Sequence, residues 1–275
     1  MKNLIKSTVV FFFILAVVNL SSCNKEASTP ELVVAKTNIT DYANIISSFA
    51  TETEDELTSS DDSYLKSASL STCFNVTVWP NANGEFYPRN WTVDYQGTDC
   101  VYLSGNTKQG KIKVSLTDFW KNEGSLRTVT YEDFYLNGNK LEGVKTILNT
   151  GLNENGNLSF TKTVKDAKLT YADGTSISWE CEKYSEMIAG RSTFLFADDV
   201  WSVNGSGKGV NLDGTNYTIN ITSPLVYNNG CFYPVSGTLQ ISTEGHELQT
   251  IDYGNGECDN LATVTSGGVT SEIEL

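Results

Sequence analysis

The chain has 275 residues, of which 33 are acidic and 19 are basic, and its formal net charge is −14 at pH 7. Such an acidic surface repels the phosphate groups of nucleic acids, so we expect no nucleic-acid partner. His246 is the one histidine of the sequence, which leaves little room for histidine-based catalysis or zinc binding.

The first 22 residues have the pattern of a bacterial lipoprotein signal peptide. Lys2 and Lys6 give a basic start, and the ten residues 9–18 that follow are all apolar. This run is too short for a transmembrane helix, which needs about 20 residues, and is typical of a cleavable signal peptide. Residues 20–23 (Leu-Ser-Ser-Cys) resemble a lipobox, in which the cysteine receives the lipid and becomes the first residue. We therefore predict a signal peptide over residues 1–22 and lipidation of Cys23.

The expected product is held in the cell envelope by its N-terminal lipid, so a membrane is its first predicted partner. Lipoproteins of the kind it resembles carry more than one acyl chain, which stabilises the anchor because a single chain binds reversibly. Residues 24–26 (Asn-Lys-Glu) weakly resemble the signal that sends lipoproteins to the cell surface in Bacteroidota. We expect an outer-membrane location, and both its periplasmic and its surface face stay open.

Residues 23–71 differ in composition from the rest of the chain. They are rich in Ser, Thr, Glu and Asp, with acidic runs at 52–56 and 61–62. This composition is typical of a tether that buries little apolar surface. Apolar residues within it recur at spacings of three and four, which predicts a short amphipathic helix over residues 40–57. They are Ile39, Tyr42, Ile45, Ile46 and Phe49.

Residues 72–275 show the alternation of apolar and polar residues that is typical of antiparallel strands with one dry and one wet face. In residues 111–116, for example, the apolar side chains all fall on one strand face. Asn-Gly and Asp-Gly pairs between such runs predict tight hairpin turns. These pairs begin at residues 83, 137, 155, 173, 204, 213 and 229. We expect an all-β domain, built as a long antiparallel meander that is rolled into a barrel or a two-layered sheet.

The two ends of this β domain, residues 73–100 and 231–258, share a pattern. Each begins with Cys-Phe, continues with Thr-Val-Asp-Tyr or Thr-Ile-Asp-Tyr, and reaches a second cysteine after four further residues. The cysteines of each segment are 27 positions apart, so a hairpin would place them side by side at its open end. Exported proteins keep such disulfides. We favour the bonds Cys73–Cys100 and Cys231–Cys258, and pairing between the two segments stays open.

The remaining cysteine, Cys181, has no cysteine partner once Cys23 carries lipid. It shares a strand face with Trp179, which predicts a small buried apolar residue. A reactive thiol would need a basic neighbourhood, whereas Glu180 and Glu182 flank this cysteine.

Signatures of common catalytic sites are missing from the sequence. It contains no Gly-x-Ser-x-Gly, His-Glu-x-x-His, P-loop or Cys-x-x-Cys motif. The adjacent acids Glu132 and Asp133, or Asp198 and Asp199, could serve a glycosidase, but such pairs arise by chance among 33 acids. We therefore predict no catalytic residues, no metal site and no cofactor.

Aromatic residues make binding the favoured class of function. Trp79 and Trp120 break the alternation, so we expect them to be exposed and able to stack on sugars. Trp91, Trp179 and Trp201 are in phase with apolar neighbours, which predicts core positions. The sequence thus favours a non-catalytic binding or structural module of the cell envelope, whose partner is a glycan or another envelope protein. The alternative is a secreted hydrolase that acts on glycans with a carboxylate pair.

Three stretches resemble a family of secreted lipoproteins of Bacteroidota. They begin at Tyr131 (Tyr-Glu-Asp-Phe-Tyr-Leu-Asn-Gly-Asn-Lys-Leu-Glu-Gly), Asp173 (Asp-Gly-Thr-Ser-Ile-Ser-Trp-Glu) and Asp252 (Asp-Tyr-Gly-Asn-Gly-Glu-Cys-Asp-Asn). The resemblance covers nearly all of residues 73–275. It implies an exported, lipid-anchored β domain and implies no particular activity.

Overall fold

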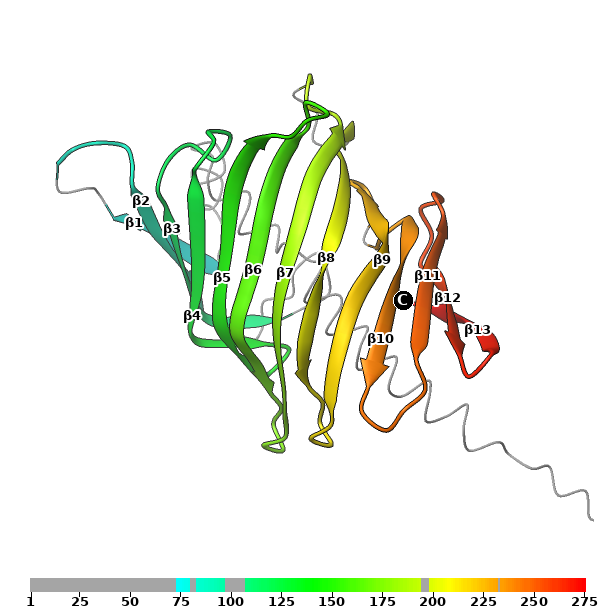
Figure 1. The fold of residues 1–275 in the computed structure, drawn as a ribbon. Helices are drawn as coiled ribbons and strands as arrows, with labels where there is room; N and C mark the ends of the chain where they lie inside the picture. Colours follow the sequence, from blue (N-terminus) through cyan, green and yellow to red (C-terminus); the bar gives the residue numbers. More distant parts are fainter. Residues whose placement is uncertain (1–72, 80–82, 97–106, 194–197, 232) are drawn as a thin grey trace, which may run out of the picture. The chain divides into compact units, whose positions relative to one another are not determined.

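The computed structural model describes residues 73–79, 83–96, 107–193, 198–231 and 233–275. Within them, thirteen strands form one antiparallel sheet in which each strand pairs with the next one in the chain (Figure 1). The strands are β1 (Phe74–Trp79), β2 (Arg89–Tyr95), β3 (Lys108–Leu116), β4 (Leu126–Leu136), β5 (Asn139–Leu152), β6 (Leu158–Thr170), β7 (Ser176–Ala189), β8 (Val200–Val210), β9 (Asn216–Asn228), β10 (Ser236–Thr243), β11 (Gln249–Asn255), β12 (Leu261–Ser266) and β13 (Val269–Glu274).

The predicted all-β meander is confirmed. The barrel version of the prediction is wrong, because the sheet is not closed and its two edges are β1 and β13. The predicted helix over residues 40–57, together with the signal peptide and Cys23, lies outside the described residues.

Alternation along the strands gives the sheet two different faces. We call the face with the buried hydrophobic side chains the apolar face, and the opposite one the polar face. On β2 and β3, for example, Trp91 lies opposite Val114 and Val93 lies opposite Ile112, and all four side chains are buried on the apolar face. Each such burial contributes about 1.5–3 kcal/mol relative to exposure. The hydrophobic stabilisation of the sheet therefore comes mainly from one face.

Glycines at positive φ form both the turns and the irregular points of the strands. The pair Asn137-Gly138 joins β4 to β5 with φ values of 52° and 78°, as the prediction of a tight hairpin requires. Asn204-Gly205, in contrast, is not a turn. It lies inside β8, where the pairing with β9 changes register between Val203 and Ser206. A Cβ atom on Gly205 would come within 2.3 Å of the Glu182 carbonyl oxygen, so β7 approaches β8 here only because the residue is glycine.

Cysteines tie one end of the hairpin formed by β10 and β11. Cys231 precedes β10, Cys258 follows β11, and the two form a disulfide with their Cα atoms 5.6 Å apart. Cys73, directly before β1, is also disulfide-bonded, and its expected partner Cys100 lies outside the described residues.

The shared Thr-Val/Ile-Asp-Tyr pattern falls on the second strand of a hairpin in both segments. It lies on β2 in the first segment and on β11 in the second. Val93 and Tyr95 are buried in the first, and Ile251 and Tyr253 take the same places in the second. The two segments therefore present the same residue types to the apolar face.

Candidate functional site

The largest exposed aromatic feature of the described sheet is Trp79, the last residue of β1. Its side chain is 59% exposed, and it lies opposite Asn90 of β2 on the polar face. The indole N–H donates a hydrogen bond of 3.5 Å to the Thr92 hydroxyl oxygen. The bond is long for an N–H···O contact, and it places the edge of the ring next to Thr92 of the neighbouring strand.

Beside Trp79, the polar face holds a shallow groove of about 350 Å³ over β1–β4. Two cross-strand rows of polar residues line it, because residues directly opposite each other in antiparallel strands share a face. One row is Asn90, Ser115 and Thr128, and the other is Thr92, Lys113 and Thr130. The volume is within the range of small-molecule sites, and the lining offers hydroxyl, amide and ammonium groups.

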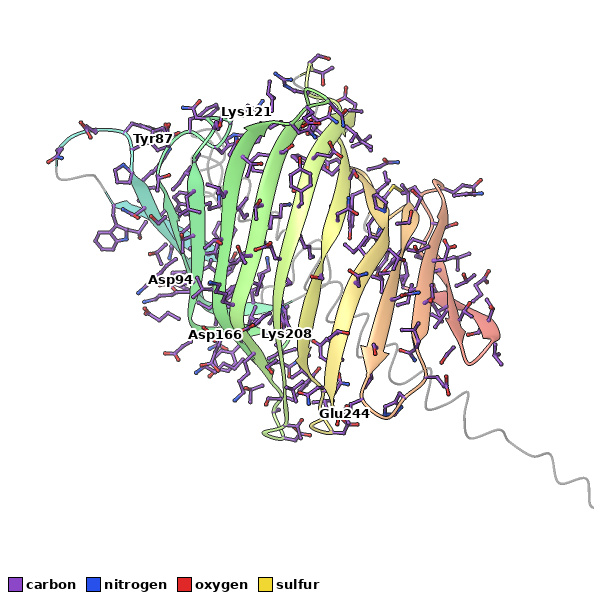
Figure 2. The ribbon with its side chains drawn as sticks, in the orientation of Figure 1. Tyr87, Asp94, Lys121, Asp166, Lys208 and Glu244 are labelled. Carbon is purple, nitrogen blue, oxygen red and sulfur yellow. A yellow bond between two sulfur atoms is a disulfide. The ribbon has the colours of Figure 1, made fainter. Side chains whose placement is uncertain are left out.

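The groove's one charged lining residue among those described, Lys113, is held by a carboxylate. Its ammonium contacts the Glu132 carboxylate, and the Lys111 ammonium lies 3.8 Å from the same carboxylate and 3.9 Å from Asp94. Asp94 is labelled in Figure 2. The hydrogen bond from Lys113 and its positive charge lower the pKa of Glu132 below its usual value. At neutral pH the groove therefore combines an exposed ring with uncharged hydrogen-bonding groups and one neutralised cation.

Trp120 occupies a different environment from Trp79. It is half-buried, its ring stacks on Phe160 with a centroid distance of 6.2 Å, and its carbonyl accepts a hydrogen bond of 2.8 Å from Asn149. Phe160 also packs against Trp201. Trp120 thus covers a hydrophobic cluster, and it does not line the groove. Trp91 and Trp179 are buried, as expected.

The two predicted carboxylate pairs make separate local contacts. Glu132 contacts Lys113, whereas Asp133 lies 3.8 Å from Lys140. The carboxylate of Asp198 accepts hydrogen bonds of 2.8 and 2.9 Å from the Thr193 hydroxyl. Burial, together with the charge of Asp198, raises the pKa of the adjacent Asp199. Neither pair lines the groove beside Trp79.

His246 and Cys181 also lie apart from the groove. His246 is exposed in the turn after β10, where its backbone N–H donates to the Thr243 carbonyl oxygen at 3.1 Å. Cys181 is a free, buried cysteine on β7, and burial raises the pKa of its thiol.

In the part of the chain that the structure describes, no three or more His, Cys, Asp or Glu side chains cluster as metal ligands. The same part holds no helix with the length and apolar character needed to span a bilayer.

The sequence pointed to Trp79 but missed the hydroxyl-bearing residues beside it. Ser115 and Thr128 belong to different strands, and only the register of the sheet brings them to the same groove. In the sequence they are marked only as polar residues of alternating strands near an exposed aromatic residue. Many strands contain such polar residues, so this pattern does not single them out.

Comparison with known proteins gives no relative, since no family model, no curated protein and no solved structure matches the chain.

Proposed function

We propose that the protein is a non-catalytic binding module of the bacterial cell envelope and that the groove beside Trp79 binds a glycan. The observation that carries this proposal is the exposed Trp79 ring, which stands beside two rows of hydroxyl and amide side chains. The lipobox-like residues 20–23 and the cysteine pattern support an exported, lipid-anchored protein attached through Cys23.

The chemistry of the groove suits a sugar ring. One face of a pyranose presents C–H groups, which stack on an indole, and its edges present hydroxyls that need donors and acceptors. The Thr92, Ser115, Thr128 and Thr130 hydroxyls can each donate and accept, and Asn90 offers both an N–H group and a carbonyl oxygen. A ring that stacks on Trp79 would place its hydroxyls against these rows.

The arrangement of carboxylates favours binding over hydrolysis. A glycosidase needs two carboxyl groups on either side of the scissile bond, about 5–9.5 Å apart. Glu132, the acid next to the groove, is engaged by Lys113 and Lys111, which keep it ionised. It is therefore suited to hold Lys113 in place and unsuited to donate a proton.

A glycan array probed with the full-length protein in a mild detergent tests the proposal. We expect binding to a subset of glycans and a loss of affinity of at least tenfold for Trp79→Ala, or about 1.4 kcal/mol. Phe86→Ala is the matched control, since Phe86 is a similarly exposed aromatic residue that does not line the groove.

Two results would overturn this function. The first is that the protein binds no glycan, or binds one equally well as Trp79→Ala. The second is that a bound glycan is shortened during incubation, which would support the hydrolase alternative.

A further inference from the structure

The groove beside Trp79 is one end of a longer feature of the polar face. Its row of Asn90, Ser115 and Thr128 does not stop at β4, because one directly opposed residue of each further strand continues it to β13. We call this row the polar track. From β2 to β13 it consists of Asn90, Ser115, Thr128, Thr146, Thr163, Glu182, Ser206, Asn220, Gln240, Thr250, Thr265 and Thr270.

The polar track offers hydrogen-bonding groups along its whole length. Every side chain of the track is half-buried or exposed, and nearly all carry a hydroxyl or an amide, which can each donate and accept. The hydroxyl oxygens of Thr146 and Thr163 are 3.1 Å apart. Those of Thr265 and Thr270 are 2.8 Å apart. Neighbouring strands therefore bring their hydroxyls close enough to share one hydroxyl group of a ligand.

Charge is nearly absent from the track. The chain has 33 acids, yet Glu182 is the one acid in the track. The charges of the next row pair with one another, as Glu180 of β7 does with Lys208 of β8 at 3.5 Å. Because the chain has a net charge of −14, it also repels anionic polymers. Both features favour an uncharged ligand.

The spacing of the strands suits a chain of sugars. Neighbouring strands lie about 4.8 Å apart, which is close to the length of one sugar unit in an extended glycan. A glycan that lies across the strands therefore meets a new track residue with each successive unit. Neighbouring strands are also rotated by about 20–25° against each other, so the track turns along its length. A single flexible chain can follow this turn, whereas the flat surface of a crystalline polysaccharide cannot.

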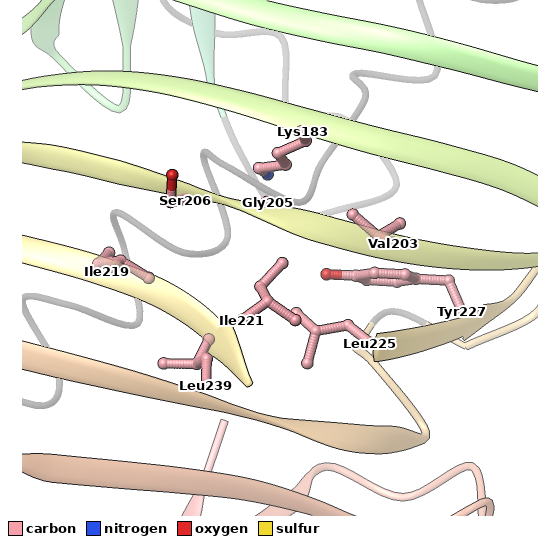
Figure 3. A pocket seen from close by; sticks show the side chains of 9 residues that line it. All are labelled: Lys183, Val203, Gly205, Ser206, Ile219, Ile221, Leu225, Tyr227 and Leu239. Atoms are coloured by element: carbon pink, nitrogen blue, oxygen red, sulfur yellow. The ribbon is translucent and has the colours of Figure 1, made fainter. Parts of the chain in front are cut away.

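The apolar face does not compete for such a ligand. The cavity on that face, lined by Lys183 and aliphatic side chains of β8–β10, has about 20 Å³, which is room for about one water molecule (Figure 3). The groove beside Trp79 has about 350 Å³. Of these two spaces, only the groove admits a sugar ring.

We propose that the polar track binds a single, linear chain of uncharged sugars, with one ring on Trp79 and the following units laid across the strands. This inference rests on the proposed glycan binding and adds the class of glycan and the length over which it is held. Each unit beyond the groove contacts a further strand, so affinity increases with the length of the chain.

The test is isothermal titration calorimetry of the full-length protein in a mild detergent. The probes are linear β-1,4-linked chains of xylose or of mannose, each with three or with ten units. Three units stay within the strands of the groove, whereas ten units reach β9 and β10. We expect the longer chain of the bound sugar to bind at least tenfold more tightly than the shorter one. An anionic chain of ten galacturonate units should bind at least tenfold more weakly than the longer neutral chain.

A double variant far from Trp79 separates the track from the groove. Asn220→Ala with Gln240→Ala removes the amides that β9 and β10 contribute. We expect at least fivefold weaker binding of the ten-unit chain and unchanged binding of the three-unit chain, which also shows that the variant is folded. Asn216→Ala is the matched control, because Asn216 is an exposed asparagine on the same strand and the same face but outside the track. It should leave the binding of both chains unchanged.

The possible failures distinguish this inference from the proposed function. Equal affinity for three and ten units, wild-type binding of the ten-unit chain by the double variant, or tighter binding of galacturonate would overturn the polar track alone. Glycan binding at Trp79 would then stand. The absence of binding by every chain would overturn both.

Discussion

The two faces of this sheet use the same residue types in opposite ways. On the polar face, Lys111 and Lys113 lie against Glu132, and the pKa of that carboxyl group falls because the lysines stabilise its charge. On the apolar face, Lys183 is buried opposite Lys162, and its own pKa falls because water is removed from its charge. The comparison teaches that the face of the sheet to which a residue points decides whether its charge is solvated or desolvated.

Tryptophan shows the same contrast within one hairpin. Trp79 on β1 is 59% exposed, whereas Trp91 on β2 is 1% exposed and belongs to a hydrophobic cluster of β2–β4. One side chain is available to a ligand, and the other stabilises the fold.

The largest expected effect is a difference in the free energy of unfolding between alanine variants of these two tryptophans. Trp91→Ala should lower the free energy of unfolding by about 3–5 kcal/mol, because it leaves a cavity in the hydrophobic cluster. Trp79→Ala should change it by less than about 0.5 kcal/mol, since its side chain is exposed. Urea denaturation of both variants measures the difference. Equal losses for the two variants would break the distinction between the faces.

A smaller effect is expected from pH. In the unfolded chain Lys183 and Lys162 titrate near 10.4, so between pH 7 and pH 8.5 the unfolded state binds more protons than the folded state. Stability must then rise with pH, by about 2 kcal/mol over this interval for folded pKa values of about 7 and 8. Urea denaturation at a series of pH values measures this slope.

Two lysine variants test whether this rise of stability with pH comes from the lysines of the apolar face. Lys183→Met should remove about two thirds of it, because the lower of the two pKa values belongs to Lys183. Lys208→Met should leave the slope unchanged, since the Lys208 side chain is 71% exposed. A slope in Lys183→Met that is as steep as in the wild type would mean that the Lys183 ammonium is solvated in the folded state.

The smallest effect concerns the polar face alone. The hydroxyl oxygens of Thr146 on β5 and Thr163 on β6 are 3.1 Å apart. A double-mutant cycle with Thr146→Val and Thr163→Val should give an interaction energy of about 0.2–1 kcal/mol, which is typical of cross-strand pairs. A value well above this range would mean that hydrogen bonds on the polar face contribute to stability on the scale of the apolar core.

Local patterns of the sequence predicted the features that depend on near neighbours. Alternation placed Trp91 and Trp179 in the core, and the equal spacing of cysteines anticipated the bond between Cys231 and Cys258. Both follow from residues within one hairpin or one strand, where backbone geometry leaves few choices.

Features that depend on distant residues were not predictable in this way. Closure into a barrel requires the first and last strands to meet, and no local pattern encodes that meeting. The pair Asn204-Gly205 has turn chemistry, yet its pairing with Tyr184 and Lys183 of β7 holds it inside β8. Lys162 and Lys183 look like solvated residues in the sequence. In β6 the pairing register shifts between Val164 and Ala167, where Asp166 has a φ of 54°. Alternation counted back from the buried Ala167 would therefore put Lys162 on the polar face, although it lies on the apolar face.

The unbroken order of the strands, β1 to β13, has a consequence for how the chain reaches its fold. Every described strand finds its partners directly before and after it in the chain, so each pairing closes only a short loop. Short loops close quickly. Because each strand pairs with the next one in the chain, a hairpin that has formed offers its free edge to the strand that follows. The first strands of the sheet can therefore pair while the last strand is still being synthesised.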